Sequence, residues 1–125
     1  ELGASLVIDS SRENPVEELK KIGGADSSIV FAPSSAVVEQ AIKATKLNGT
    51  IVVGVWSTLG EFPFPDEKRI VGTAIGSRQV MREVLQLAGA GKIKPVIDEF
   101  KLEDANDVLN MLKQGEVRAR AVLLP

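Results

Sequence analysis

Short apolar runs alternate with longer amphipathic stretches along the first 75 residues. Three runs rich in branched side chains are typical of buried strands, and they span Ser5–Asp9, Ser28–Ala32 and Thr50–Val55. A fourth run, Arg69–Ile75, predicts a strand that is interrupted at Gly72. Because the connections are short and mostly helical, this alternation indicates an α/β fold with right-handed crossovers and a parallel sheet.

Helix start and stop signals stand between these runs. Asn14 followed by Pro15 predicts the start of a helix that Gly23 ends, with Asn as the cap and Pro at the first helical position. Ser34 or Ser35 is expected to cap the next helix. The apolar face of that helix is Val37, Val38, Ala41 and Ile42.

The pair Asn48-Gly49 predicts a turn into the third strand, so that the strand starts at Thr50. The proline-rich stretch 60–66 predicts a surface connection between the third and fourth strands.

The last 50 residues predict a helix followed by a strand–helix–strand segment. Ser77 is expected to cap a helix that runs to about Ala90, and Val96–Phe100 is a predicted strand. The next helix has apolar residues at i, i+3, i+4 and i+7, and Gly115 ends it. Val117–Leu124 is expected to close the chain as a strand.

Composition narrows the class of protein. The chain has 125 residues, of which 44% are hydrophobic and 26% charged, as in an ordinary soluble domain. A net charge of −2 supplies no basic surface, so we expect no nucleic-acid partner. No apolar run is long enough to span a membrane and no leader is visible, so we expect a cytoplasmic protein without membrane contact.

The residue types that are missing limit the chemistry further. The chain has no Cys, no His and no Tyr, which excludes a disulfide framework, a zinc site of the usual kind and a Ser-His-Asp triad within it. We therefore predict no catalytic and no metal-binding residue, and no catalysis by this chain alone. Because Glu1 to Ala4 read as a helix end without an initiator Met, we expect a piece of a longer protein.

Several segments, in their order along the chain, carry a family resemblance. They are an "ELGA…VID" start, "NGTIVVGV", "RIVGTAIGSR", "AGAGKIKPVI" and "LEDANDVLNMLKQGEVRARAVLLP". This series resembles the distal coenzyme domain and C-terminal segment of medium-chain, zinc-type alcohol dehydrogenases, over essentially the whole chain. The resemblance implies a partial Rossmann sheet in the order 3-2-1-4-5-6, with the four runs as strands 3–6 and helices on both faces. Residues 1–75 would belong to the cofactor domain and residues 76–125 to a connecting helix and a segment returning to the catalytic domain.

The resemblance also implies which residues contact the cofactor. Phe31 and Ala32, at the end of strand 4, match residues beside the adenosine, although Phe31 is also an ordinary core candidate. Val53, Gly54 and Val55 match the main chain that passes the nicotinamide-side ribose, where a glycine permits close approach.

Two further segments complete the implied cofactor site. Thr73, Ala74 and Ile75 match the segment whose main chain holds the carboxamide. Arg120 matches an arginine that reaches the pyrophosphate through a paired hydrogen-bond fork, with Arg118 as the competing choice. The alternative for Arg120 is an ordinary solvated strand-end arginine.

The implied enzyme transfers hydride between an alcohol or carbonyl substrate and NAD or NADP, with NAD favoured. Zinc would be held only by the part of the parent protein that this chain lacks. A homodimer or tetramer would form through the strand Arg69–Ile75, and Trp56 either lines a substrate cleft or packs as an ordinary aromatic. Two alternatives remain, a zinc-free quinone reductase of the same superfamily and a non-catalytic α/β nucleotide-binding module.

Overall fold

The computed structural model describes residues 3–125 and divides them into two units, with the boundary between Ile75 and Gly76. The helix end expected at Glu1 to Ala4 therefore begins outside the described residues. The first unit is built on a parallel sheet of three strands and the second on a parallel pair of strands. Both units alternate helix and strand, which confirms the α/β class and the C-terminal strand–helix–strand segment.

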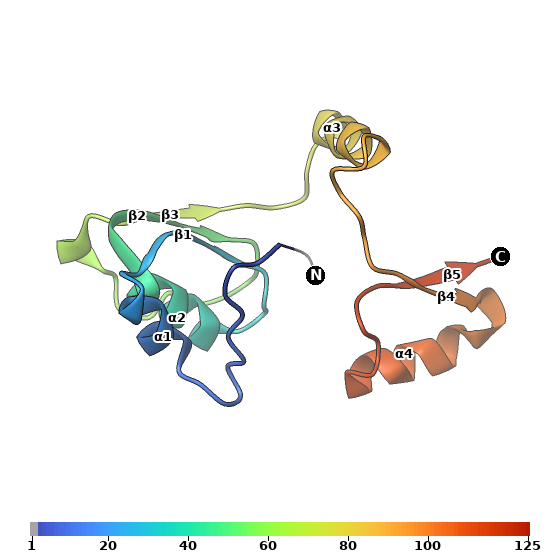
Figure 1. Ribbon diagram of the computed structural model, residues 1–125, viewed down its shortest axis with the longest axis horizontal. Helices are drawn as coiled ribbons and strands as arrows, with labels where there is room; N and C mark the ends of the chain where they lie inside the picture. Colours follow the sequence, from blue (N-terminus) through green and yellow to red (C-terminus); the bar gives the residue numbers. More distant parts are fainter. Residues whose placement is uncertain (1–2) are drawn as a thin grey trace. The chain divides into compact units, whose positions relative to one another are not determined.

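The sheet of the first unit has the order β1-β2-β3, and both strand pairs are parallel. Figure 1 shows α1 and α2 together on one side of this sheet. The elements are α1 (Pro15–Lys21), β1 (Ala25–Val30), α2 (Ser35–Ala44), β2 (Thr45–Val53), the 3₁₀ turn η1 (Phe64–Asp66) and β3 (Arg69–Gly72).

The core of this unit lies between α2 and the sheet. Val38 and Ile42 stand four residues apart, so they share one face of α2, and they pack against Val30 of β1 and Ile51 of β2. Val38 and Ile51 are 0% exposed. Burying a side chain of this size contributes about 1.5–3 kcal/mol, so these four residues hold the helix on the sheet. The apolar face predicted for this helix is confirmed.

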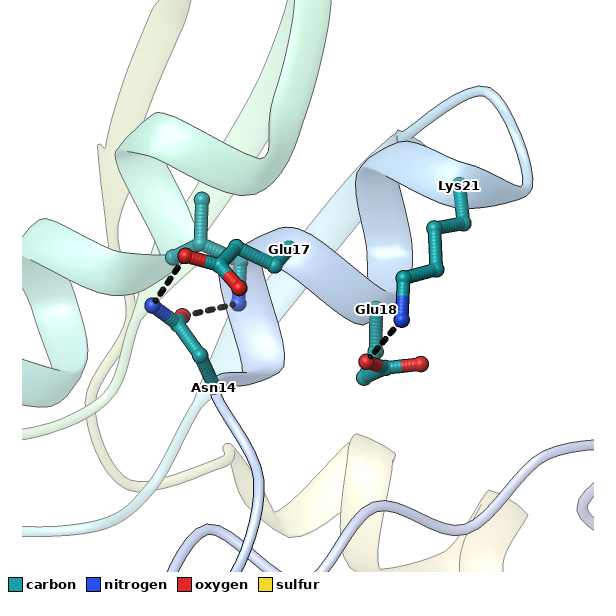
Figure 2. A network of polar contacts seen from close by, with 5 residues as sticks. Asn14, Glu17, Glu18 and Lys21 are labelled. Carbon is teal, nitrogen blue, oxygen red and sulfur yellow. Dashed lines mark hydrogen bonds and ion pairs between the residues drawn. The ribbon is translucent and has the colours of Figure 1, made fainter.

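The first helix begins where its sequence signal places it. The Oδ1 of Asn14 accepts a hydrogen bond from the backbone N–H of Val16, while its Nδ2 donates to Glu17 at 3.2 Å (Figure 2). The side chains of Glu18 and Lys21 form an ion pair one turn further along the helix. In the second helix Ser34, one of the two predicted caps, occupies the N-cap position, but its side chain makes no capping hydrogen bond.

The strand predicted at Ser5–Asp9 is wrong, because these residues form no strand. Leu6 is 50% and Val7 81% exposed, and no ladder joins them to β1 within the described part of the chain. An apolar run becomes a strand only when another strand satisfies its backbone groups. In the implied order 3-2-1-4-5-6, Ser5–Asp9 would be strand 3 and β1 would be strand 4. Two other strands separate them, so the two segments are not expected to pair.

The other strands of this unit are shifted from their predicted ends. The strand expected at Ser28–Ala32 is β1, which ends at Val30, and the strand expected at Arg69–Ile75 is β3, which ends at Gly72. β1 stops at Val30 because the residue in register with it, Val53, is the last of its partner β2. β3 stops because its partner β2 ends at Val53, which leaves the last residues of the predicted run without a ladder partner.

β2 starts at Thr45, five residues earlier than predicted. The turn expected at Asn48-Gly49 lies inside this strand, where the ladder is irregular. Ala25 is level with Thr45, whereas Ser27 is already level with Thr50, so the extra residues of β2 bulge out of the ladder. Asn48 adopts a φ of 59° in this bulge. Gly49 is buried there, and a Cβ on it would lie 2.9 Å from the carbonyl oxygens of both Asp26 and Lys46.

The second unit contains a long helix followed by a β-α-β segment. Ser77 caps its first helix as predicted, since its Oγ accepts a hydrogen bond from the N–H of Val80. The last helix ends as predicted at Gly115, whose φ is 73°. The two strands are shorter or shifted relative to the predicted runs Val96–Phe100 and Val117–Leu124. The elements are α3 (Arg78–Gly89), β4 (Asp98–Lys101), η2 (Leu102–Asp104), α4 (Ala105–Gln114) and β5 (Ala121–Leu124).

Candidate functional site

The three strands of the first unit end level with one another. Val30 of β1 is in register with Val53 of β2, which is in register with Gly72 of β3. Beyond these positions the backbone of Gly54 donates to the carbonyl oxygen of Val30, and that of Thr73 donates to Val53, both at 2.9 Å. The residues that follow the strands are therefore held side by side at the carboxyl edge of the sheet, where open parallel sheets bind ligands.

The ring of Phe31 lies against the main chain of Gly54. A Cβ built on Gly54 would come within 2.5 Å of Cε1 and 2.6 Å of Cδ1 of Phe31, and within 3.3 Å of Cγ2 of Thr73. Only a residue without a side chain allows this contact. Phe31 is 70% exposed, so the alternative in which it belongs to the core is wrong.

A hollow of about 620 Å³ opens at this edge of the sheet. Six of the nine predicted cofactor-contacting residues line it, namely Val53, Gly54, Val55, Thr73, Ala74 and Ile75. Trp56 and Gly72 complete the lining. Gly72 also lines the hollow, although the sequence analysis did not predict it. Its position directly before Thr73, on the same predicted strand, could have indicated it.

The lining of this hollow carries no charged or titratable side chain. Val53 and Val55 pack against the hydrophobic core, so their side chains serve the fold while their main chain borders the hollow. Trp56 and Ile75 are fully exposed. The hollow therefore suits a flat, uncharged group that contacts apolar side chains and main-chain polar atoms, and it offers no residue for proton transfer.

The remaining predicted residues lie outside this lining. Ala32 is exposed, and its carbonyl oxygen accepts a hydrogen bond from Ser34 N at 2.8 Å, which turns the chain toward α2. Arg120 is exposed in the second unit, directly before β5, and its carbonyl oxygen accepts a hydrogen bond from Asp98 N at 2.9 Å. The backbone of Arg120 thus extends the β4–β5 ladder, and its contact with a cofactor stays a prediction.

Three side chains with shifted pKa values lie at the surface, and none of them lines the hollow. Hydrogen bonds from Ser11 lower the pKa of Asp9. The hydrogen bond with Glu18 raises the pKa of Lys21, and the hydrogen bond from Lys46 lowers that of Asp26. Each shift reflects a local ion pair or turn, so these groups do not indicate a second reactive site.

A smaller hollow of about 440 Å³ has a different character. Its charged lining residues are three lysines and three carboxylates: Lys20, Lys43, Lys68, Glu39, Glu61 and Asp66. The ammonium of Lys68 is already occupied by contacts within the protein, because its Nζ donates to the carbonyl oxygen of Ile42 at 2.7 Å and pairs with Asp66 at 2.6 Å. The balanced charge favours neither an anion nor a cation, so the hollow at the strand ends is the candidate site.

Among residues 3–125, no group of three or more His, Cys, Asp or Glu side chains is placed to hold a metal ion. The helices of that same range are all too short or too polar to cross a bilayer.

Comparison with known proteins points to one family. The family model described as "Zinc-binding dehydrogenase" matches residues 1–90. An alcohol dehydrogenase of Geobacillus stearothermophilus is 32% identical, with 98% of this chain and 38% of that protein covered.

Solved structures give the same result for the fold. The alcohol dehydrogenase of the archaeon Aeropyrum pernix has a TM-score of 0.88 at 30% identity, covering 98% of this chain and 38% of that chain. An NAD-dependent alcohol dehydrogenase has a TM-score of 0.81 at 24% identity with the same coverage, which shows the shared fold. The chain thus spans a little over a third of the length of these relatives.

Proposed function

The chain belongs to the zinc-binding dehydrogenase family, and we propose that its hollow receives the nicotinamide end of the cofactor in an alcohol dehydrogenase. One observation carries this proposal: Phe31, Gly54 and Thr73 meet at the carboxyl ends of three parallel strands, where the main chain of Gly54 is covered by the ring of the exposed Phe31. Dinucleotides bind at this edge of doubly wound sheets. The relatives are alcohol dehydrogenases, so the comparisons do not favour the quinone reductase or the non-catalytic alternative.

The lining residues fit a nicotinamide ring. The ring is flat and carries an amide, which matches apolar side chains at Ala74 and Ile75 and main-chain donors and acceptors along 53–55 and 73–75. A nicotinamide cofactor held there would serve as the acceptor of the hydride from the alcohol carbon, with the hydroxyl proton released and a carbonyl compound formed. In the proposal Phe31 and Ala32 continue the contact toward the adenosine, and NAD is favoured over NADP.

The hollow has no side chains suited to proton transfer or metal binding. The hollow offers no titratable side chain, and the chain has neither His nor Cys. The residues of this chain therefore do not fit a zinc ion. In the proposal, the metal of the family and the acid–base groups belong to a region of the enzyme outside these 125 residues. The chain alone is then expected to bind but not to catalyse.

The two units have separate roles in this proposal. Residues 1–75 form the distal part of the cofactor domain, and residues 76–125 form a connecting helix and the segment that returns to the catalytic domain.

Within the described sheet β3 is an edge strand, with Val71 47% exposed and no Lys or Pro between Arg69 and Gly72. We include in the proposal a homodimer or tetramer in which two copies pair through this strand, and a cytoplasmic location. Sedimentation equilibrium of the wild-type chain and of Val71→Lys tests the pairing.

Nuclear magnetic resonance tests the proposed site directly. Nicotinamide mononucleotide and NAD⁺, titrated into the ¹⁵N-labelled chain, should both shift the amide signals of Gly54, Thr73 and Ala74 while leaving Gly115 unmoved. The expected affinity is weak, because the described residues offer the pyrophosphate no glycine loop at a helix N-terminus following a strand. Unmoved signals at the strand ends would overturn the proposal. A dissociation constant in the micromolar range would contradict only the expected weakness.

A further inference from the structure

Asn48 and Gly49 form a dipeptide whose chemistry favours spontaneous deamidation. In this reaction the backbone nitrogen of the residue after an asparagine attacks the carbonyl carbon of the asparagine side chain. A following glycine has no side chain to hinder the approach. Of the four asparagines in the sequence, only Asn48 precedes a glycine, and Asn14 precedes a proline, whose nitrogen carries no hydrogen. Asn48 is therefore the asparagine whose local sequence is most reactive.

The bend Lys46–Gly49 holds Asn48 in a geometry that opposes this attack. Asn48 has a φ of 59°, whereas the φ of Leu47 is negative. A Cβ on Gly49 would lie 2.9 Å from the carbonyl oxygen of Lys46, so the two ends of the bend are close together. A positive φ at the second central residue alone is the signature of a type II turn, in which ψ at that residue is about 0°. The nitrogen of Gly49 is then turned away from the Cβ of Asn48, and ring closure requires a large rotation about the Cα–C bond of Asn48.

The surroundings of Gly49 block this rotation. Gly49 is buried, and a Cβ on it would also lie 2.9 Å from the carbonyl oxygen of Asp26. The Nζ of Lys46 donates to Oδ1 of Asp26 at 2.8 Å, which fastens the bend to β1. The ladder continues directly after the bend, where Ser27 is level with Thr50, so turning the peptide breaks it there. All of these contacts lie within the first unit, so they hold whatever else the chain contacts.

We propose that Asn48 is a deamidation site that the fold keeps unreactive and that opening of the β1–β2 ladder releases. In the opened chain, the nitrogen of Gly49 bonds to Cγ of Asn48. The bond from Cγ to the side-chain nitrogen breaks, and that nitrogen leaves as ammonia with the proton of the Gly49 amide. Water then opens the succinimide ring at either carbonyl, which gives aspartate or isoaspartate. The inference involves no cofactor or substrate, so it is independent of the proposed function.

Isoaspartate at position 48 should prevent the bend from closing again. In isoaspartate the main chain runs through the former side chain, which adds one carbon atom to the backbone. The bend has no room for it, because the main chain of Gly49 is packed between the carbonyl oxygens of Asp26 and Lys46. The extra atom also disturbs the register between Ser27 and Thr50. Deamidation therefore converts a transient opening of the ladder into a lasting one.

Trypsin makes the reaction at this site easy to follow. Its peptide 47–68 contains Asn48 and no other Asn or Gln, so any deamidation of that peptide reports on Asn48. The 125-residue chain is incubated at mildly alkaline pH in native buffer and in urea, and the peptide is measured by mass spectrometry. Deamidation in native buffer should be at least about tenfold slower, which corresponds to an opening free energy of about 1.4 kcal/mol or more.

Two core substitutions test which part of the chain protects Asn48. Ile51 of β2 is 0% exposed, and Ile51→Val should loosen the ladder and accelerate deamidation in native buffer about threefold to tenfold. Val108 is 5% exposed and belongs to the second unit. Val108→Ala is therefore the matched control, and it should leave the rate at Asn48 unchanged.

A third variant tests the effect of the added backbone atom. Asn48→Asp carries the same charge as the isoaspartate product without lengthening the main chain. After purification and return to native buffer, the isoaspartate chain should unfold at a lower urea concentration than Asn48→Asp. Equal unfolding midpoints would overturn the lasting opening of the ladder.

The rates decide whether the fold controls the reaction. Equal rates in native buffer and in urea, or no deamidation in either, would overturn the proposal. It is also overturned if Ile51→Val reacts no faster than the wild type in native buffer, or if Val108→Ala accelerates the reaction as much as Ile51→Val does.

Discussion

The ring of Phe31 lies so close to the main chain of Gly54 that a methyl group there would come within 2.5 Å of its Cε1 atom. The two residues belong to the ends of neighbouring strands and meet because Val30 and Val53 are in register. Phe31 is 70% exposed, so the ring can swing into solvent at little cost to the fold. The contact therefore shapes the surface of the candidate site more than it stabilises the sheet.

Gly54→Ala should displace this ring without unfolding the protein. The new methyl group forces Phe31 aside and occupies the space beside the main chain that the ring held, so nucleotide affinity should fall by about tenfold or more, which corresponds to about 1.4 kcal/mol. The free energy of unfolding should change by less than about 1 kcal/mol, because the displaced atoms belong to an exposed side chain. Calorimetry with NAD⁺ and urea unfolding measure the two effects.

Gly72→Ala is the matched control for the position of the Phe31 ring, since a Cβ there meets no atom within 4 Å. Phe31 ring signals that do not move in Gly54→Ala would contradict the argument.

Arg120→Ala should weaken nucleotide binding if the arginine reaches the pyrophosphate. The loss of a charge-assisted hydrogen bond to a phosphate costs about 1.5–3 kcal/mol, or roughly a tenfold to hundredfold rise in the dissociation constant. Arg118→Ala is the matched variant two residues earlier. Calorimetry with NAD⁺ on the whole enzyme measures both. A loss of affinity in Arg118→Ala alone would show that the two arginines were assigned in the wrong order.

Asn14→Ala should destabilise the first unit through its first helix. The side chain of Asn14 accepts a hydrogen bond from Val16 N at 3.1 Å, and losing such a cap costs about 1 kcal/mol. Ser34→Ala is the matched control, because Ser34 occupies the cap position of α2 without a side-chain hydrogen bond. Its effect should stay within about 0.5 kcal/mol. Urea unfolding compares the two, and equal losses would contradict the role assigned to the Asn14 side chain.

Asp66→Asn should destabilise the fold more than the removal of an exposed ion pair. The side chain of Lys68 is only 5% exposed, and its ammonium depends on Asp66 and on the carbonyl oxygen of Ile42. Removing the negative charge leaves a buried ammonium without a counter-ion, which should cost about 1.5–3 kcal/mol. Asp9→Asn is the comparison, since Asp9 and Arg12 form a pair with 53% and 82% exposed side chains. A larger loss for Asp9→Asn in urea unfolding would contradict the importance of burial.

The stability contributed by Asp26 should depend on pH and on salt. Its hydrogen bond from Lys46 Nζ, at 2.8 Å, holds the pKa of Asp26 below the unperturbed value of 3.8. A carboxyl with a lowered folded-state pKa contributes stability above its unfolded pKa, and that contribution is lost as the pH falls through the folded value. Carbon-detected titration should show the pKa rising toward 3.8 in Lys46→Gln. Salt on the order of 1 M should have the same effect, because the pair is exposed and the screening length is then about 3 Å. An Asp26 pKa that stays the same in Lys46→Gln and in high salt would contradict the pairing of Asp26 with Lys46.

The sequence by itself determined the features that depend on a few neighbouring residues. The caps at Asn14 and Ser77 and the stop at Gly115 were predicted correctly, because each depends on hydrogen bonds and φ angles within one helical turn. The α/β class followed from the alternation of apolar periods, and the absence of His and Cys excluded the usual metal site from composition alone.

Only the tertiary structure decided which apolar runs pair and where each strand stops. Ser5–Asp9 has the composition of a strand, yet without a neighbouring strand it forms none, because a ladder requires a second backbone. The exposure of Phe31 over Gly54, and the completion of the hollow by Gly72 and Trp56, follow from the register between distant segments. Which strands become neighbours, and where each one stops, depends on hydrogen bonds between segments far apart in the chain, which no single local pattern specifies.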